Sequence, residues 1–220
     1  MKPITPFMGN FFCIIPNTGV AFVAISKNAV TFLKKVAYYN GSREKVWEKG
    51  FTSVHDLIGY SDGSPYLVPV DKMQEFENKH GVYTKFAVWR DPIERIVSTY
   101  KLFCLDGEFR RYFHFLGLVG GTSFDRFVDF LEFEWEKKDP LWQDEHIRRQ
   151  VDYYNPSEVN YIVNIHNLHS FLTDFNVPFK SEISNKTLSS FELTNEKHLT
   201  RIRQYYKADY QIECNYEKPD

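Results

Sequence analysis

The chain has 220 residues, of which 43% are hydrophobic and 25% are charged, a composition typical of a globular rather than a disordered protein. At this length the simplest expectation is a single domain that spans residues 1–220. The formal net charge of −2 disfavours nucleic acid as the main partner, because proteins that bind duplexes usually carry a basic excess.

The cysteines and the lengths of the apolar runs further limit the class of protein. Cys13, Cys104 and Cys214 are widely spaced and form no CxxC pair, which argues against a disulfide framework or a zinc site and favours a reducing compartment. No apolar run has the roughly 20 residues that a membrane-spanning helix needs. The apolar stretch 10–25 is interrupted at Pro16, so it is not typical of a signal peptide.

In chain order, the first expected elements are two strands and a helix. Runs of β-branched and aromatic residues predict strands over 11–15 and 20–25, and the turn signal at 17–19 predicts a hairpin or two adjacent strands. Apolar residues at helical spacing predict a helix over 29–39. Residues 42–69 show no clear period and are expected to form a long connection. Two lysines are expected off the apolar face of the helix and a glycine at its end: Lys34, Lys35 and Gly41.

Further along the chain, helical and strand patterns alternate. The expected elements are helices over 71–80 (ended by Gly81), 92–103, from about 122 onward, 168–175 and 195–208, and strands over 82–89 and 160–165. Strands that alternate with helices predict an α/β fold with a mainly parallel central sheet flanked by helices.

The first stretch that carries chemistry is Ile25-Ser26-Lys27-Asn28-Ala29-Val30-Thr31, at a predicted strand-to-helix turn. Backbone N–H groups at a helix N-terminus lack intrahelical partners, and the helix dipole adds positive potential, so such a turn can bind an anion. Lys27 and Thr31 can add a charge and a hydroxyl to one phosphate or sulfate group. The stretch is not a Walker A sequence, and the alternative interpretation is a plain strand-turn-helix with an exposed lysine.

The second stretch runs from Lys85 to Tyr100 and again joins a strand to a helix. Pro92 suits the first helical position, and Asp91 suits the cap before it. Arg90 and Ser98 can together grip a phosphate, one through a guanidinium and the other through a hydroxyl. The alternative is that Asp91 only caps the helix while the arginines of this stretch, Arg90 and Arg95, pair with nearby carboxylates.

These two stretches resemble the two cofactor motifs of the carbohydrate sulfotransferases, in particular the group that contains the chondroitin and HNK-1 sulfotransferases and their bacterial relatives. Asp144–Gln150 is similar to the family's Asp-x-His-Trp-x-x-Gln, and Tyr205–Tyr210 is similar to its closing Tyr-x-x-Asp-Phe helix. The order and separation of all four agree over about residues 10–216. Ser26 stands where the family usually has Pro, and Ile147 replaces the usual Trp.

The resemblance implies a P-loop-NTPase-like sulfotransferase fold. It also implies that an in-line displacement moves a sulfuryl group from 3′-phosphoadenosine 5′-phosphosulfate to a carbohydrate hydroxyl, which leaves adenosine 3′,5′-bisphosphate. Backbone N–H groups of the turn would hold the 5′-phosphosulfate, and Lys27 would neutralise the oxygen that bridges sulfur and phosphorus. No metal is demanded, since the lysine and the helix N-termini supply positive charge. The implied donor-binding residues are Ser26, Lys27, Asn28, Ala29, Val30 and Thr31 for the 5′ side, and Arg90, Ser98 and Lys186 for the 3′-phosphate.

Transfer to a hydroxyl requires a general base. His146 is the first candidate because it lies in one of the family-like stretches, although a lone histidine is more often packed or solvated. His55 is the second, because it follows the first predicted helix in an irregular stretch. Other candidates for the base are His80, His114, Glu44 and Asp106, whereas His166, His169 and His198 are expected to be structural.

Two other function classes stay open. One is a different nucleotide-dependent transferase, such as a P-loop kinase, which the absent Walker A sequence and the lack of an obvious magnesium-holding acidic pair disfavour. The other is a non-catalytic module on the same fold that binds an anion or a glycan.

The expected partners are a nucleotide donor and a glycan acceptor, with no nucleic acid and no membrane span. The pairs Lys137-Lys138 and Arg148-Arg149 are candidates to meet an anionic glycan, although such pairs are common on solvated faces. The expected location is the cytoplasm, or the Golgi lumen if the chain is a truncated eukaryotic form.

Aromatic residues make up 17% of the chain, and most are expected to pack in its core. Those expected inside are Phe22, Phe32, Phe86, Tyr100, Phe124, Phe127 and Phe171. Those left to stack on adenine or on a sugar face are Trp89, Phe109, Tyr112, Phe113 and Phe115.

Overall fold

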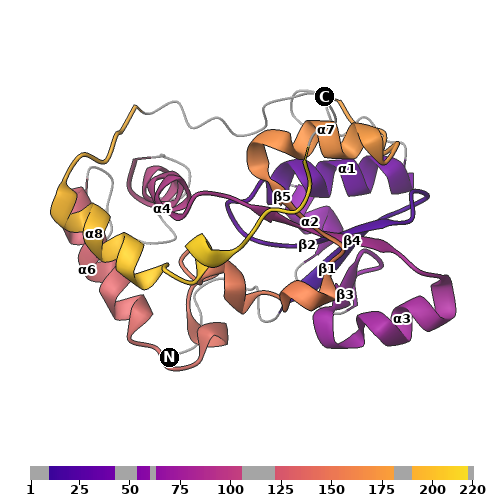
Figure 1. Cartoon of the computed structure of the whole chain (residues 1–220), viewed down its shortest axis with the longest axis horizontal. Helices are drawn as coiled ribbons and strands as arrows, with labels where there is room; N and C mark the ends of the chain where they lie inside the picture. Colours follow the sequence, from indigo (N-terminus) through magenta and orange to yellow (C-terminus); the bar gives the residue numbers. More distant parts are fainter. Residues whose placement is uncertain (1–9, 43–53, 60–62, 106–121, 181–189, 218–220) are drawn as a thin grey trace.

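The computed structural model describes residues 10–42, 54–59, 63–105, 122–180 and 190–217. In this part of the chain, one sheet has the strand order β3-β1-β2-β4-β5 (Figure 1). Its strands are β1 (Phe11–Ile15), β2 (Val20–Val23), β3 (Leu67–Pro69), β4 (Thr84–Trp89) and β5 (Tyr161–Asn164). The helices are α1 (Val30–Ser42), α2 (Val54–Ile58), α3 (Met73–His80), α4 (Pro92–Tyr100), α6 (Phe124–Trp135), α7 (Leu168–Asp174) and α8 (Glu196–Tyr205).

The sheet is mixed, so the prediction of a mainly parallel sheet holds for only two of its four strand pairs. β2 pairs with β4 and β4 with β5 in parallel, whereas β1 pairs antiparallel with both β2 and β3. The turn at Asn17 to Gly19 causes the difference, because a tight turn can join only antiparallel strands. The parallel half of the sheet, β2-β4-β5, is the half from which the chemistry-bearing stretches emerge.

Both faces of the sheet are covered, as the alternation of its side chains requires. One face, which includes Phe22 and Phe86, packs on α1, α2 and α7. The other face, which includes Val23 and Ala87, packs on Met73 of α3 and on Tyr153 and Tyr154. Figure 1 shows α1 and α7 together on one side of the sheet and α3 on the other.

A second core lies beside the sheet, where α4, α6 and α8 pack together (Figure 1). It is strongly aromatic: Tyr100, Phe124 and Phe127 are all buried there. All seven aromatic residues that the sequence places in the core are buried, which confirms these seven predictions.

Several element boundaries differ from the predictions. α1 continues past Gly41 to Ser42, and α2 and β3 lie within the stretch 42–69 that was expected to be a connection. β2 ends at Val23, and β4 begins only at Thr84. α4 ends at Tyr100 and continues as one π-helical turn, η2 (Lys101–Leu105).

Short 3₁₀ turns connect the longer elements in the described chain. They are η1 (Val70–Lys72), η4 (Pro140–Trp142), η5 (Gln150–Asp152), η6 (Pro156–Glu158), η7 (Ile165–Asn167) and η8 (Asp209–Gln211). None of the helices in the described part of the chain combines the length and apolarity needed to cross a bilayer.

Candidate active site

The two predicted donor-binding stretches lie where β2 and β4 end. The chain leaves β2 through Ser26 and Lys27 into α1, and it leaves β4 through Arg90 into α4. Because β2 and β4 are parallel neighbours, their carboxyl ends meet at one edge of the sheet, which is where open α/β sheets bind ligands.

The turn between β2 and α1 has an unusual backbone. Lys27 (φ 68°) and Ala29 (φ 59°) are in the left-handed region, while Asn28 between them is not. For residues with a side chain this costs roughly 1–2 kcal/mol each. Such an alternation of hand can direct N–H groups to one side and form an anion-binding concavity at the start of α1. Within this turn the Asn28 N–H donates to the Ile25 carbonyl at 3.2 Å. The backbone of this turn therefore suits an anionic group.

Arg90 connects the two chemistry-bearing stretches. Its Nη1 donates to the backbone carbonyl of Lys27 at 2.9 Å, while its Nε lies 3.4 Å from the exposed carboxylate of Glu94. Ser98 lies half-buried two turns into α4. The predicted cap is present, because the Asp91 carboxylate accepts from the backbone N–H of Glu94 at 3.0 Å.

Arg95 does not pair with a carboxylate. Its side chain is fully buried and donates to three backbone carbonyls, those of Ser26 (3.0 Å), Arg148 (2.7 Å) and Glu145 (3.0 Å). The structure thus assigns Arg95 a bridging position between the first stretch and the 144–150 stretch, which the sequence did not reveal.

Gln150 and Asp209 bring the other two family-like stretches to the same turn. The Nδ2 of Asn28 donates to the Gln150 side-chain oxygen at 2.5 Å and to the Val88 carbonyl at 2.6 Å. The Gln150 Nε2 donates to the Arg90 carbonyl at 2.9 Å. Asp209, which is fully buried, accepts from the backbone N–H of Gln150 at 3.0 Å. Burial raises the pKa of Asp209.

His55 lies against the turn from α2. Its Nε2 is 3.0 Å from the Thr31 hydroxyl. Burial, together with the charges of Lys34 and His146, lowers the pKa of His55 to about 4, so its ring is neutral at pH 7. A hydroxyl has one proton to donate. In the tautomer that carries a proton on Nε2, the ring donates to the Thr31 oxygen, so the Thr31 proton stays available for a phosphate oxygen.

His146 is held by a buried carboxylate. Its Nδ1 and its backbone N–H both lie 2.8 Å from one oxygen of Asp144. Its ring also makes an edge contact with Phe103, with centroids 5.1 Å apart. A carboxylate on Nδ1 fixes the tautomer and leaves Nε2 to accept a proton, which is the arrangement of an oriented general base.

Two buried charged residues near the turn were missed by the sequence analysis. Lys34 was expected off the apolar face of its helix, but it is fully buried and donates to the Gly59 carbonyl at 3.2 Å. Burial lowers the pKa of Lys34, and the negative charges of Glu145 and Asp56 oppose that shift. Glu145 is also buried and accepts from the Ser26 hydroxyl at 2.8 Å. Neither a helical period nor a motif signals these contacts, because they join segments far apart in the chain.

The basic pairs are largely engaged within the protein. Lys137 lies 2.6 Å from the buried Glu134, and Arg149 makes two 2.9 Å contacts with Asp152. Arg148 is buried, with its guanidinium 4.0 Å from the centroid of the Tyr153 ring. Of the four, Lys138 is the exposed one, so the pairs do not form a broad cationic face.

The remaining candidates lie away from the turn or outside the described residues. His80 is exposed on α3, and its ring contacts the Phe76 ring with centroids 4.4 Å apart. Trp89 is half-buried, and its indole N–H donates to the Asp209 carbonyl at 2.9 Å. The candidates outside the described residues are Glu44, Asp106, Phe109, Tyr112, Phe113, His114, Phe115 and Lys186.

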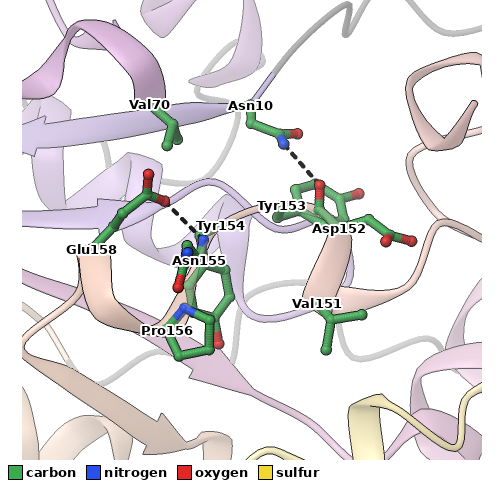
Figure 2. A pocket seen from close by; sticks show the side chains of 9 residues that line it. All are labelled: Asn10, Val70, Val151, Asp152, Tyr153, Tyr154, Asn155, Pro156 and Glu158. Carbon is green, nitrogen blue, oxygen red and sulfur yellow. Dashed lines mark hydrogen bonds between the residues drawn. The ribbon is translucent and has the colours of Figure 1, made fainter.

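A separate open pocket of about 500 Å³ lies near the start of β1 (Figure 2). Within it, the side-chain amide of Asn10 donates to the Asp152 carbonyl, and the Glu158 carboxylate accepts from the Asn155 backbone, both at 2.8 Å. None of its nine lining residues is a predicted site residue, so this pocket is distinct from the turn at Lys27. Among the described residues, no group of three or more His, Cys, Asp or Glu is arranged to hold a metal ion.

Comparison with known families gives one clear finding. A family model described as "Sulfotransferase family" matches residues 10–212, which is nearly the whole chain and includes all four family-like stretches. No significant match was found among curated proteins or among solved structures.

Proposed function

The chain belongs to the sulfotransferase family, and from this premise we propose that it is a single-domain enzyme that uses 3′-phosphoadenosine 5′-phosphosulfate to sulfate a carbohydrate hydroxyl. The observation that carries the proposal is the 2.9 Å contact from Arg90 Nη1 to the Lys27 carbonyl. It joins an anion-binding turn to an arginine that can bind a second phosphate at the same sheet edge, as a donor with phosphates at both its 5′ and 3′ ends requires.

Different residues hold the 5′ and 3′ sides of the donor. The donor supplies an activated sulfuryl group on a good leaving group. The N–H groups of residues 26–30 and the Thr31 hydroxyl bind the 5′ side, in a P-loop-like arrangement. Lys27 neutralises the charge that develops on the leaving oxygen. Arg90 and Ser98 hold the 3′-phosphate, and Lys186 is a further candidate for that phosphate.

His146 is the proposed general base. With Nδ1–H held by Asp144, its Nε2 takes the proton of the acceptor hydroxyl as that oxygen attacks sulfur. His55 is the second candidate, but its contact with Thr31 favours a role in orienting that hydroxyl. The cysteines at 13, 104 and 214 are free, which supports a reducing, cytoplasmic location.

The donor proposal is tested by thermal shift and by sulfuryl transfer from labelled donor to a panel of glycans. Adenosine 3′,5′-bisphosphate should raise Tm, and ATP with Mg²⁺ should not. Lys27→Ala should lower kcat by at least about 100-fold, because preorganised charge on a leaving group contributes on that scale. Arg90→Ala should mainly weaken the binding of adenosine 3′,5′-bisphosphate.

Equal or greater stabilisation by ATP with Mg²⁺ would favour a kinase-like transferase. Nucleotide binding without transfer to any glycan would favour a non-catalytic module.

The base is tested with His146→Ala, which should lower kcat by about 10²–10⁴-fold. Asp144→Asn should also lower kcat, because an amide no longer fixes the tautomer of the ring. His80→Ala is the matched control, since that ring is exposed on α3 and should leave kcat unchanged. If His146→Ala kept full activity while His55→Ala lost it, the assignment of the base would pass to His55.

A further inference from the structure

Ser26, the residue immediately before Lys27, is held on two sides. Its side chain is buried, and its hydroxyl donates to Glu145 Oε2 at 2.8 Å. Its backbone carbonyl accepts from Arg95 Nε at 3.0 Å. The peptide that leads into Lys27 is therefore fixed by one side-chain contact and one main-chain contact, both to residues distant in the sequence.

Glu145 is itself held firmly. Its carbonyl accepts from Arg95 Nη2 at 3.0 Å and from the Tyr153 hydroxyl. One guanidinium thus binds the main chain of both Ser26 and Glu145, and the hydroxyl–carboxylate bond closes the same unit. A buried carboxylate is costly unless it has partners, and in this structure its oxygen Oε2 is committed to the turn.

The turn needs such support because Lys27 is strained. A φ of 68° is unfavourable for a residue with a side chain, and it persists only where the surroundings fix it. We infer that the Ser26–Glu145 hydrogen bond is a positioning contact that holds Lys27 in its left-handed conformation and so aims its ammonium group at the transferring centre. The orientation of the Lys27 ammonium group toward the transferring centre rests on the proposed function. The support of the Lys27 backbone rests on the observed contacts alone.

Two pairs of variants distinguish an effect of the hydrogen bond from an effect of side-chain size or charge. Ser26→Ala and Glu145→Ala remove the contact, while Ser26→Thr keeps a hydroxyl and Glu145→Gln keeps an acceptor oxygen. The two alanine variants should lower kcat at least tenfold, with a smaller loss of affinity for adenosine 3′,5′-bisphosphate, because a misplaced reacting group costs rate. The conservative variants should retain at least a third of kcat. The double alanine variant should be no slower than the single ones.

Amide hydrogen exchange of residues 26–31, measured without donor, provides a readout that does not depend on activity. Ser26→Ala and Glu145→Ala should speed exchange there about tenfold, while exchange in β4 stays unchanged. The control is Glu77→Gln, since Glu77 is an equally buried carboxylate that pairs with Lys85 far from the turn. Its turn exchange and kcat should match the wild type.

The outcomes distinguish the two proposals. If the wild type transfers no sulfuryl group but the exchange pattern is as expected, the proposed function fails and the positioning contact stands. If both alanine variants keep wild-type exchange at the turn, or if the conservative variants are as impaired as the alanine variants, the positioning inference is overturned. Should Glu145→Ala fail to fold, Ser26→Ala decides alone, since it removes a single oxygen atom.

Discussion

Single residues around the β2–α1 turn show how burial sets protonation. Lys34 and Glu145 are ionisable side chains removed from water. Burial lowers the pKa of Lys34 and raises the pKa of Glu145, and both shifts favour the neutral form. His55 shows the same effect at a pH that can be reached in solution, because burial lowers its pKa to about 4. The ring is thus neutral where it meets Thr31, and its protonation opposes folding.

The pH dependence of stability follows from this shift. An unfolded histidine has a pKa of about 6.5, so between pH 6.5 and pH 4 the unfolded chain binds a proton that folded His55 does not. The free energy of unfolding therefore falls as the pH falls through this window, by up to about 3 kcal/mol, and the His55 contribution levels off below pH 4.

Urea unfolding of the wild type and of His55→Gln at several pH values from 7 to 4 measures this contribution. Glutamine does not titrate, so the variant should lose less stability across the window than the wild type does. A control with His80→Gln removes an exposed histidine and should leave the wild-type slope intact. Parallel curves for His55→Gln and the wild type would mean that the His55 pKa is not lowered in the folded protein.

At the scale of elements, α4 has clear terminal signals at its start. Pro92 occupies the first turn and the Asp91 side chain caps it, so the sequence predicts the N-terminus to the residue. Its C-terminus has no comparable signal, and the chain continues as the π-helical turn Lys101–Leu105. Packing of Phe103 and Cys104 in the aromatic core holds that turn, which is a tertiary effect.

The cap gives a prediction about stability. Asp91→Ala removes the acceptor of the Glu94 N–H and should lower the free energy of unfolding by about 0.5–2 kcal/mol. Asp91→Asn keeps an acceptor oxygen and should lose much less. Urea denaturation of both variants provides the measurement. Equal losses would show that the charge near the helix dipole, and not the cap, is the contributing interaction.

At the scale of the whole molecule, Asp209 joins the end of the chain to its centre. Its carboxylate accepts from the backbone N–H groups of Gln150 (3.0 Å) and Val151 (3.1 Å), and Gln150 in turn contacts Asn28 and the Arg90 main chain. The four family-like stretches are thus one hydrogen-bonded unit, although they are spread over most of the chain.

Removal of this carboxylate should affect the entire fold. Asp209→Ala leaves two N–H groups at η5 without their acceptor, and an unmet buried group costs about 1–3 kcal/mol. We expect the free energy of unfolding to fall by about 2–4 kcal/mol in urea titrations. Asp174→Ala, which removes an exposed carboxylate that binds the Tyr216 hydroxyl, is the control and should cost less than about 1 kcal/mol. A loss below the control would mean that η8 does not anchor the site.

The sequence by itself indicated most of the longer helices and strands, and it singled out the two strand-to-helix turns at Lys27 and Arg90. Periodicity and terminal signals are local properties, so α4, α6 and β1 could be read from residues close together in the chain. The motifs at Lys27 and Arg90 also indicated the family, which the match over residues 10–212 shows.

Only the tertiary structure decided how these parts meet. It showed the antiparallel pairing of β1 with β3, the burial of Lys34, and the contacts of Ser26 with Glu145 and of Asn28 with Gln150. The pairing and the hydrogen bonds join residues that are far apart in the chain, so no sequence period signals them. The burial of Lys34 depends on which surface that face of its helix meets. Burial and hydrogen-bond partners are properties of the packed chain, and they set the strain and protonation on which the site depends.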